Sequence, residues 1–139
     1  MFVFTYGLWS SGLIPMLMSY IPNPSHGAHS IIQTNTVISA VSITMSQILS
    51  NVPFVSLYNN VMIDNGITSN DISQWMMLVA ASTIAGNLTI FGAASNIIII
   101  EAAESKGVKA FTFAEFIKIG AIVTVVNIII YYLFITTIF

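Results

Sequence analysis

The residues best suited to bind a small solute lie in two short interruptions of otherwise apolar sequence. The first interruption consists of Ser50, Asn51 and Pro53, inside the uncharged stretch Ser30–Ile63. Asn offers hydrogen-bond donors and acceptors, and Gly permits unwound backbone. No acid, His or Cys lies in a predicted span to act as a base or nucleophile, so we predict binding and not enzymatic catalysis. The second interruption contains Gly86, Asn87, Thr89, Gly92, Ser95 and Asn96.

The composition predicts an integral membrane protein. Of 139 residues, 6% are charged and 56% are hydrophobic. Soluble domains carry about 25% charged residues, so this chain cannot build a solvated surface. The net charge of −2 is diffuse and predicts no nucleic-acid partner. The chain has no Cys, which excludes disulfides and thiolate metal sites.

Four uncharged stretches alternate with polar breaks and predict an all-α, multi-pass protein of the plasma membrane. A helix needs about 20 apolar residues to cross a bilayer. The first stretch lacks the charged start and the cleavage site of a signal peptide, so the chain is expected to be a piece of a longer protein. We interpret the stretches as a membrane helix at 1–21, a re-entrant hairpin at 30–63, a broken membrane helix at 72–105 and a membrane helix at 116–139.

The hairpin prediction rests on length and on one proline. As a single helix, Ser30–Ile63 would be about 51 Å long, against a hydrocarbon core of about 30 Å. Pro53 lacks an N–H and disfavours helical geometry in the residue before it. Non-helical backbone at membrane depth must be buried in protein or line a wet cavity, which makes the tip a candidate site. The alternative is a Pro-kinked structural helix. The expected elements are a helix Ile31–Leu49, a tip at Ser50–Pro53 and a helix Phe54–Ile63.

A polar stripe leads along the first hairpin helix to the tip. Its members recur every three or four residues and therefore share one narrow arc of the helix. The stripe either lines a wet path or permits close helix packing, because Ser is common at membrane helix contacts. Its members are Asn35, Ser39, Ser42, Ser46 and Ser50.

The third stretch predicts two half-helices, Ser73–Ala85 and Ser95–Ser105, that join near the bilayer midplane. The alternative is an ordinary helix with small residues at a packing face. Two Asn and two Gly in the centre of the span favour the break, since a lipid-facing helix would not leave those amides unpaired. Many secondary transporters bind substrate where discontinuous helices meet, and helix N-termini attract anions.

Two segments carry a family resemblance. The segments SQILSNVPFVSLY and STIAGNLTIFGAASNIIIIEAAESKGVKAFTFAEFIKIG resemble the C-terminal part of the arsenite efflux pump membrane subunit family, in the citrate-transporter-like ion transporter superfamily. The resemblance implies two inverted repeats, each with a re-entrant hairpin and a broken helix, around a shared substrate site. It places the first polar interruption at the second hairpin tip and the second interruption at the unwound helix.

The chain departs from the family's pattern, and these departures narrow the range of substrates and coupling ions that the resemblance implies. Family members are much longer, so the first repeat is missing here. The dicarboxylate branch has Ser-Asn-Thr at the tip, and Val52 replaces that Thr, which counts against sodium coupling. The sodium–proton antiporter-like branch tends to place an acid where this chain has Ser50. The implied substrate is therefore arsenite or another small oxyacid or organic anion, with a proton or cation as coupling ion and no cofactor. Dicarboxylate or citrate transport and sodium–proton exchange remain alternatives.

Two functional hypotheses stay open. One is half of a secondary transporter, whose partners are membrane lipid and either a separate first-repeat half or copies of itself. The other is a truncated or accessory membrane subunit that does not transport. His26 and His29 are read as residues of a solvated loop, and no metal site is predicted. The positive-inside tendency places Lys106–Lys118 in the cytoplasm and the Asp64–Asp71 loop outside.

Overall fold

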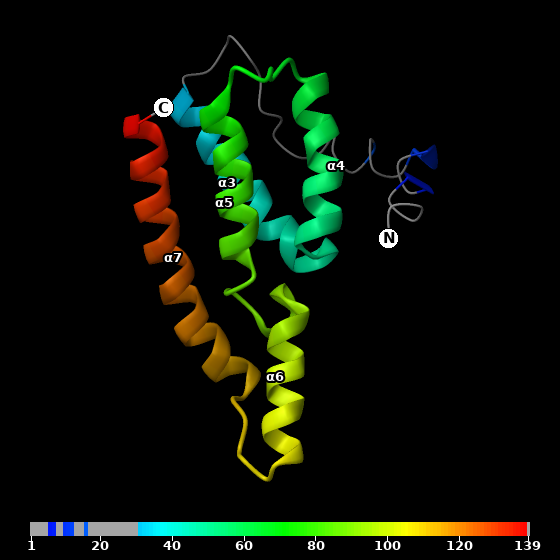
Figure 1. Ribbon diagram of the computed structural model, residues 1–139, viewed down its shortest axis with the longest axis vertical. Helices are drawn as coiled ribbons and strands as arrows, with labels where there is room; N and C mark the ends of the chain where they lie inside the picture. Colours follow the sequence, from blue (N-terminus) through cyan, green and yellow to red (C-terminus); the bar gives the residue numbers. More distant parts are fainter. Residues whose placement is uncertain (1–5, 8–9, 13–15, 17–30, 139) are drawn as a thin grey trace.

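The computed structural model describes residues 6–7, 10–12, 16 and 31–138, and the regular elements of this part are all helical. The membrane helix expected at 1–21 lies almost entirely outside the described residues, and so do His26 and His29. The elements in Figure 1 are α3 (Ile31–Leu49), α4 (Asn51–Asp64), α5 (Ile72–Ala85), a short 3₁₀ turn η1 (Ile90–Gly92), α6 (Ala94–Ser105) and α7 (Phe113–Ile138).

Helices α3 and α4 form a hairpin that packs with α5 and α7. Figure 1 shows α3 running down to a tip near the middle of the long axis, from which α4 returns to the top. Helix α5 lies along α3 and also contacts α4, while α7 packs against α5 and reaches α3. Apolar side chains from these helices build one core, and their close packing favours association of the helices. The core residues are Ile38, Val41, Phe54, Leu57, Tyr58, Val61, Met62, Ile67, Met77, Leu78 and Ile135.

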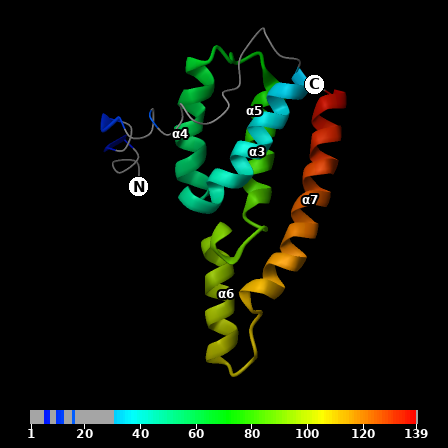
Figure 2. The ribbon, with the colours of Figure 1, turned by 180° about the vertical axis from the view of Figure 1, so that it is seen from behind.

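Helix α6 lies apart from this core. Figure 1 and the reverse view in Figure 2 show α5 and α6 following one another along the long axis, with a break between them. The hairpin tip lies at the height of this break, so the hairpin accompanies α5 and not α6. No residue of α6 is buried in the described part of the chain.

Two glycines end helices and thereby set the loops at opposite ends of the molecule. Gly66 has a φ of 85° and Gly107 a φ of 72°, a region that other residues rarely adopt. After α4, the N–H of Gly66 donates to the Ile63 carbonyl at 2.9 Å, and the next N–H donates to the Met62 carbonyl at 3.0 Å. Gly107 closes α6 with the same pair of bonds, which is the Schellman motif.

Helix α7 is the one described helix that is long and apolar enough to cross a membrane. Only 17% of its most apolar window is buried, so most of its surface faces outward. It begins at Phe113, three residues before the predicted start at 116, because Thr112 and Glu115 form a capping box. The Thr112 N–H donates to Glu115 Oε2 at 2.8 Å, and the Glu115 N–H donates to Thr112 Oγ1 at 3.4 Å.

The hairpin tip is shorter than predicted. Helix α3 has the predicted bounds Ile31–Leu49, but α4 begins at Asn51 and not at Phe54. Only Ser50 is non-helical, so the predicted tip Ser50–Pro53 is wrong in extent. Pro53 occupies the first turn of α4, where backbone N–H groups have no helical partner and a proline removes nothing. The halves of the broken helix begin at Ile72 and Ala94, one residue before each predicted start.

Candidate functional site

The first break is a single residue in a strained conformation. Ser50 has φ 64° and ψ 158°, a combination that only Gly adopts readily. Its side chain forms no cap on α4. The first N–H of α4 with a backbone partner is that of Phe54, which donates to the Ser50 carbonyl at 3.2 Å. Because Pro53 has no N–H, the N–H groups of Asn51 and Val52 form the positive end of the helix, and neither has a backbone partner among the described residues.

Asn51 is the polar side chain closest to this free helix end. It is half-buried, and its Oδ1 atom is buried without a hydrogen-bond partner in the described part of the chain. A buried acceptor without a donor costs free energy, so an unpaired one in a native protein calls for an explanation. A bound solute that donates a hydrogen bond would satisfy it.

The second break spans residues 86–93 and is tightly organised. The N–H groups of residues 86, 87 and 88 each donate to a carbonyl three residues back, at 3.2, 3.0 and 3.1 Å. Thr89 and Ala93 then adopt extended backbone on either side of η1. Ala93 is the N-cap of α6 and has no polar side chain, so α6 also begins without a side-chain cap.

Asn96 holds the two ends of this break together. It lies in the first turn of α6, and its Nδ2 donates to the Gly86 carbonyl at 3.0 Å and to the Thr89 carbonyl at 3.2 Å. The amide therefore satisfies the Gly86 carbonyl at the end of α5 and gives the Thr89 carbonyl a second donor beside the Gly92 N–H. The Asn96 side chain therefore closes the unwound segment into a loop.

Gln47, in the last turn of α3, ties the hairpin to the unwound segment. Its Nε2 donates to the Ala85 carbonyl at 2.7 Å, and its Oε1 accepts from the Thr89 hydroxyl at 2.7 Å. Sequence reasoning missed this residue because it lies off the serine stripe of α3. The available signal was a Gln near the end of an apolar helix, where a buried amide needs partners.

The two breaks meet at Gly86. A Cβ added to Gly86 would lie 3.5 Å from Asn51 Nδ2 and 3.5 Å from the Ala93 Cβ. Asn51 is the first residue of α4 and Ala93 is the N-cap of α6. The two uncapped helix N-termini therefore lie on either side of one glycine, and their partial positive charges act on the same small volume.

Two further glycines permit this close approach. A Cβ at Gly92 would lie 3.0 Å from Gln47 Oε1 and 3.0 Å from the carbonyls of Ala85 and Gly86. On α7, a Cβ at Gly120 would lie 2.2 Å from the Asn87 carbonyl oxygen. The unwound segment is thus held between the hairpin on one side and α7 on the other.

The structure brings together five of the nine predicted site residues. Three others, Ser50, Asn87 and Ser95, are exposed, and Pro53 is half-buried in the first turn of α4. Direct contact of these nine residues with a solute remains a prediction. The five that meet at the junction of the breaks are Asn51, Gly86, Thr89, Gly92 and Asn96.

The serine stripe of α3 serves packing for most of its length. Asn35, Ser39, Ser42 and Ser46 are all buried, in the helix that packs along α5. Asn35 Nδ2 donates to the Ser73 hydroxyl of α5 at 2.8 Å. Small side chains allow this close approach, so the structure favours the packing interpretation over an open wet path.

The junction of the breaks contains only uncharged groups. No Asp, Glu, Lys, Arg or His occurs in Ser30–Ile63 or Ile72–Ile100. Among the described residues, no three His, Cys, Asp or Glu side chains are grouped so that they could hold a metal ion. Recognition at this junction must therefore use amides, a hydroxyl, backbone groups and helix dipoles.

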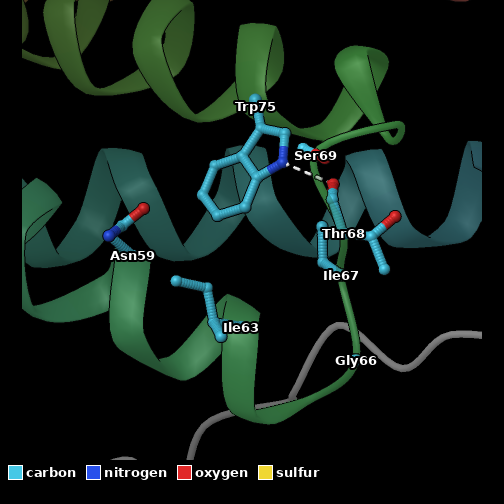
Figure 3. Close-up of a pocket in the computed structure, with 7 residues that line it drawn as sticks. All are labelled: Asn59, Ile63, Gly66, Ile67, Thr68, Ser69 and Trp75. Carbon is cyan, nitrogen blue, oxygen red and sulfur yellow. Dashed lines mark hydrogen bonds between the residues drawn. The ribbon is translucent and has the colours of Figure 1, made fainter.

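A separate open pocket lies at the other end of the hairpin (Figure 3). Its volume is about 610 Å³. The Trp75 indole N–H donates to the Thr68 carbonyl at 2.8 Å across its rim. None of the predicted site residues lines this pocket. Its lining residues are Asn59, Ile63, Gly66, Ile67, Thr68, Ser69 and Trp75.

Comparisons with known proteins place the chain beside transporters. It is 32% identical over 103 residues to an uncharacterized transporter of Mycobacterium tuberculosis. This match covers 70% of this chain and 24% of that protein. The match to a silicon efflux transporter of Oryza sativa is 35% over 71 residues, 49% of this chain and 15% of the relative. A transporter named arsB in Dictyostelium discoideum is 32% identical over 94 residues, 68% of this chain and 16% of the relative.

The chain is a relative of membrane transporters. It spans about a quarter or less of the length of the curated relatives it matches. No protein-family model matches the chain, and no solved structure matches it. None of these relatives is named as an enzyme, which agrees with the absence of a nucleophile and base at the breaks.

Proposed function

We propose that this chain forms the substrate-binding part of a secondary active transporter for arsenite or another small oxyacid, in the arsenite efflux branch of the citrate-transporter-like superfamily. The observation that carries the proposal is the position of Asn51. Its buried Oδ1 has no partner among the residues that the structure describes, and its amide lies beside Gly86, where two helix breaks meet. Discontinuous helices of this kind bind substrate in many secondary transporters.

The chemistry of the junction favours an uncharged or weakly anionic substrate. Arsenite and silicic acid are neutral polyhydroxy acids, whose hydroxyls both donate and accept hydrogen bonds. The Asn51 amide can do the same, and the two helix N-termini add about half a positive charge each. A dicarboxylate would bring two full negative charges to a junction without a cationic side chain. The names of the silicon efflux and arsB relatives agree with an oxyacid substrate.

We further propose a multi-pass arrangement in the plasma membrane. In it, α5, the break and α6 make one crossing, α7 makes the next, and α3 with α4 enters and leaves from one side. Figure 1 supports this arrangement, because the hairpin accompanies α5 and its tip stops at the height of the break. Irregular backbone at that depth would be tolerated only where it is buried or lines a wet cavity.

The proposed site is completed by a second, inverted set of the same elements, from a longer chain or from a separate partner. The outward faces of α6 support this, since no residue of α6 is buried in the described part of the chain. A proton or a cation would couple transport to a gradient. On this proposal, the 139-residue chain reconstituted alone moves neither arsenite nor dicarboxylates.

A transport assay tests the proposed function. The complete gene that encodes this chain is expressed in cells without their own arsenite efflux, and export of arsenite, silicic acid and succinate is measured. The proposal predicts saturable export of at least one of the two oxyacids and none of succinate. Export of succinate alone would favour the dicarboxylate alternative, and no saturable flux of any of the three would favour a subunit that does not transport.

A further inference from the structure

Gln47 is the one side chain of the hairpin that is hydrogen-bonded to the unwound segment within the described part of the chain. Besides donating to the Ile43 carbonyl of its own helix at 3.3 Å, Gln47 makes two bonds that hold both ends of a short span. Ala85 is the last residue of α5, and Thr89 is the extended residue before η1. Gln47 also lies four residues before Asn51, across the Ser50 break. It therefore links the hairpin tip directly to the second break.

The atoms around Gln47 pack closely against this link. A Cβ at Gly92 would lie 3.0 Å from Gln47 Oε1, so the turn η1 closes over the amide. The same hypothetical atom would lie 3.0 Å from the Ala85 carbonyl that accepts the Gln47 bond. A shift of the unwound segment relative to the hairpin would have to break at least one of the two Gln47 bonds.

We propose that Gln47 is a positioning residue, which fixes the unwound segment against the hairpin tip and so sets the affinity of the junction for its solute. This inference rests on the proposed function, since it assigns Gln47 a role in that site. Gln47 itself does not touch the solute. It acts through Thr89 and Ala85, whose placement fixes Gly86 beside the Asn51 amide. The Thr89 hydroxyl is then committed to Gln47 and not to the solute.

The two Gln47 bonds demand opposite chemistry at the two ends of one side chain. The bond to Ala85 needs a donor, and the bond from Thr89 needs an acceptor. Glutamate of the same shape supplies both only when it is protonated. Ionised, it would face the Ala85 carbonyl with a second acceptor. A glutamate at this position therefore keeps both bonds while it is protonated and loses the bond to Ala85 when it ionises.

Gln47→Glu therefore gives the proposal a signature in pH. In the complete transporter, we expect kcat/KM of the variant to approach that of the native protein at about pH 5 and to fall about tenfold relative to it by about pH 8. The change should lie mainly in KM. Dividing by the native profile removes the effect of a coupling proton. Gln33→Glu is the matched control, because Gln33 is exposed on the same helix, and its normalised profile should be flat.

Thr89 supplies an independent arm that involves no new charge. Thr89→Ser keeps the hydroxyl that donates a hydrogen bond to Gln47 Oε1, and it should keep the native KM. Thr89→Val loses this hydroxyl and should raise KM several-fold. Thr83→Val is the control, because its exposed hydroxyl donates only to Val79 of its own helix. In Gln47→Leu, which has lost the acceptor, Thr89→Val should raise KM little further.

The outcomes separate the two proposals. A flat normalised pH profile for an inserted Gln47→Glu protein overturns the positioning role, and so does equal KM for Thr89→Ser and Thr89→Val. If Gln47→Glu does not accumulate in the membrane, the Thr89 pair decides alone. Absence of transport by the native protein would instead contradict the proposed function.

Discussion

The two helix breaks solve the same problem in different ways. At the hairpin tip, one residue makes the whole break, and Ser50 takes a strained φ of 64° to do so. At the second break, eight residues unwind. The Asn96 amide donates to the carbonyls of Gly86 and Thr89 within it, and the Gln47 amide donates to the carbonyl of Ala85 just before it. The tip leaves the side-chain Oδ1 of Asn51 without a hydrogen-bond partner in the described ranges.

This difference assigns the breaks different roles. The second break has a fixed backbone, because side chains from α3 and α6 hold it in place. We call this segment, residues 86–93, the platform. On the proposed function, the tip contacts the solute, because within the described part of the chain it presents an unpaired amide oxygen and free N–H groups. Strain and unpaired polar groups cluster at binding sites, where a ligand offsets them. The variants below test this contrast, beginning with the platform.

The largest effect is expected on the α7 side of the platform. In Gly120→Ala, the new Cβ would lie 2.2 Å from the Asn87 carbonyl oxygen, so backbone must move. Overpacking of this kind costs about 3 kcal/mol, of which about 1 returns through the better helix propensity of Ala. The free energy of unfolding should therefore fall by about 2 kcal/mol, seen as a lower midpoint of thermal unfolding in detergent.

Gly7 provides the matched control for this substitution. A Cβ there would meet no atom of the described residues within 4 Å, so Gly7→Ala should leave the midpoint unchanged or raise it slightly. If Gly120→Ala is as stable as the native chain, the platform is not held against α7, and the contrast between the breaks weakens.

A smaller effect of opposite sign is expected at the tip. Ser50→Gly removes the strain of a positive φ and should stabilise the chain by about 1 kcal/mol. Ala93→Gly is the counterpart at the second break, where φ is −145° and unstrained. It should destabilise by about 0.5 kcal/mol, because Gly loses more backbone freedom on folding. Two midpoints shifted in the same direction would remove the distinction between a strained and a relaxed break.

The arrangement of the halves can be tested without any effect on stability. If α5 and α6 form one crossing, the loops beyond them face opposite sides of the membrane. Asn70 and Val108 are exposed in these loops, and the chain has no other thiol to interfere with a single cysteine. We expect Asn70→Cys to react with an impermeant thiol reagent on intact cells, and Val108→Cys to react only after lysis. Labelling of both from the same side would contradict a single crossing.

Much of the helical framework could be predicted from the residues. The bounds of α3 follow from apolar length and from the polar interruption at Ser50. The split between α5 and α6 follows from Gly and Asn in an apolar span, to within one residue at each predicted start. The predicted tip is too long, because Pro53 breaks helix interiors but fits the first turn of a helix. Local chemistry therefore located the breaks but not their exact size.

The contacts that join the two breaks could not be predicted. Gln47 bonds to residues 38 and 42 positions away, and no local pattern indicates which distant carbonyl an amide will meet. The structure also shows that Gly120 of α7 packs on the unwound backbone. Such pairings depend on how the helices fold onto one another, which periodicity does not specify.

The central claim is that Asn51 binds the solute where the two breaks meet. The most direct test is transport by Asn51→Ala in the complete transporter, with Asn59→Ala, an exposed position on the same helix, as control. We predict that Asn51→Ala inserts normally but loses transport, while Asn59→Ala transports as the native protein does. If Asn51 only supports the start of α4, the change should cost about 1 kcal/mol of stability and leave transport intact. Native transport kinetics in Asn51→Ala would contradict the account.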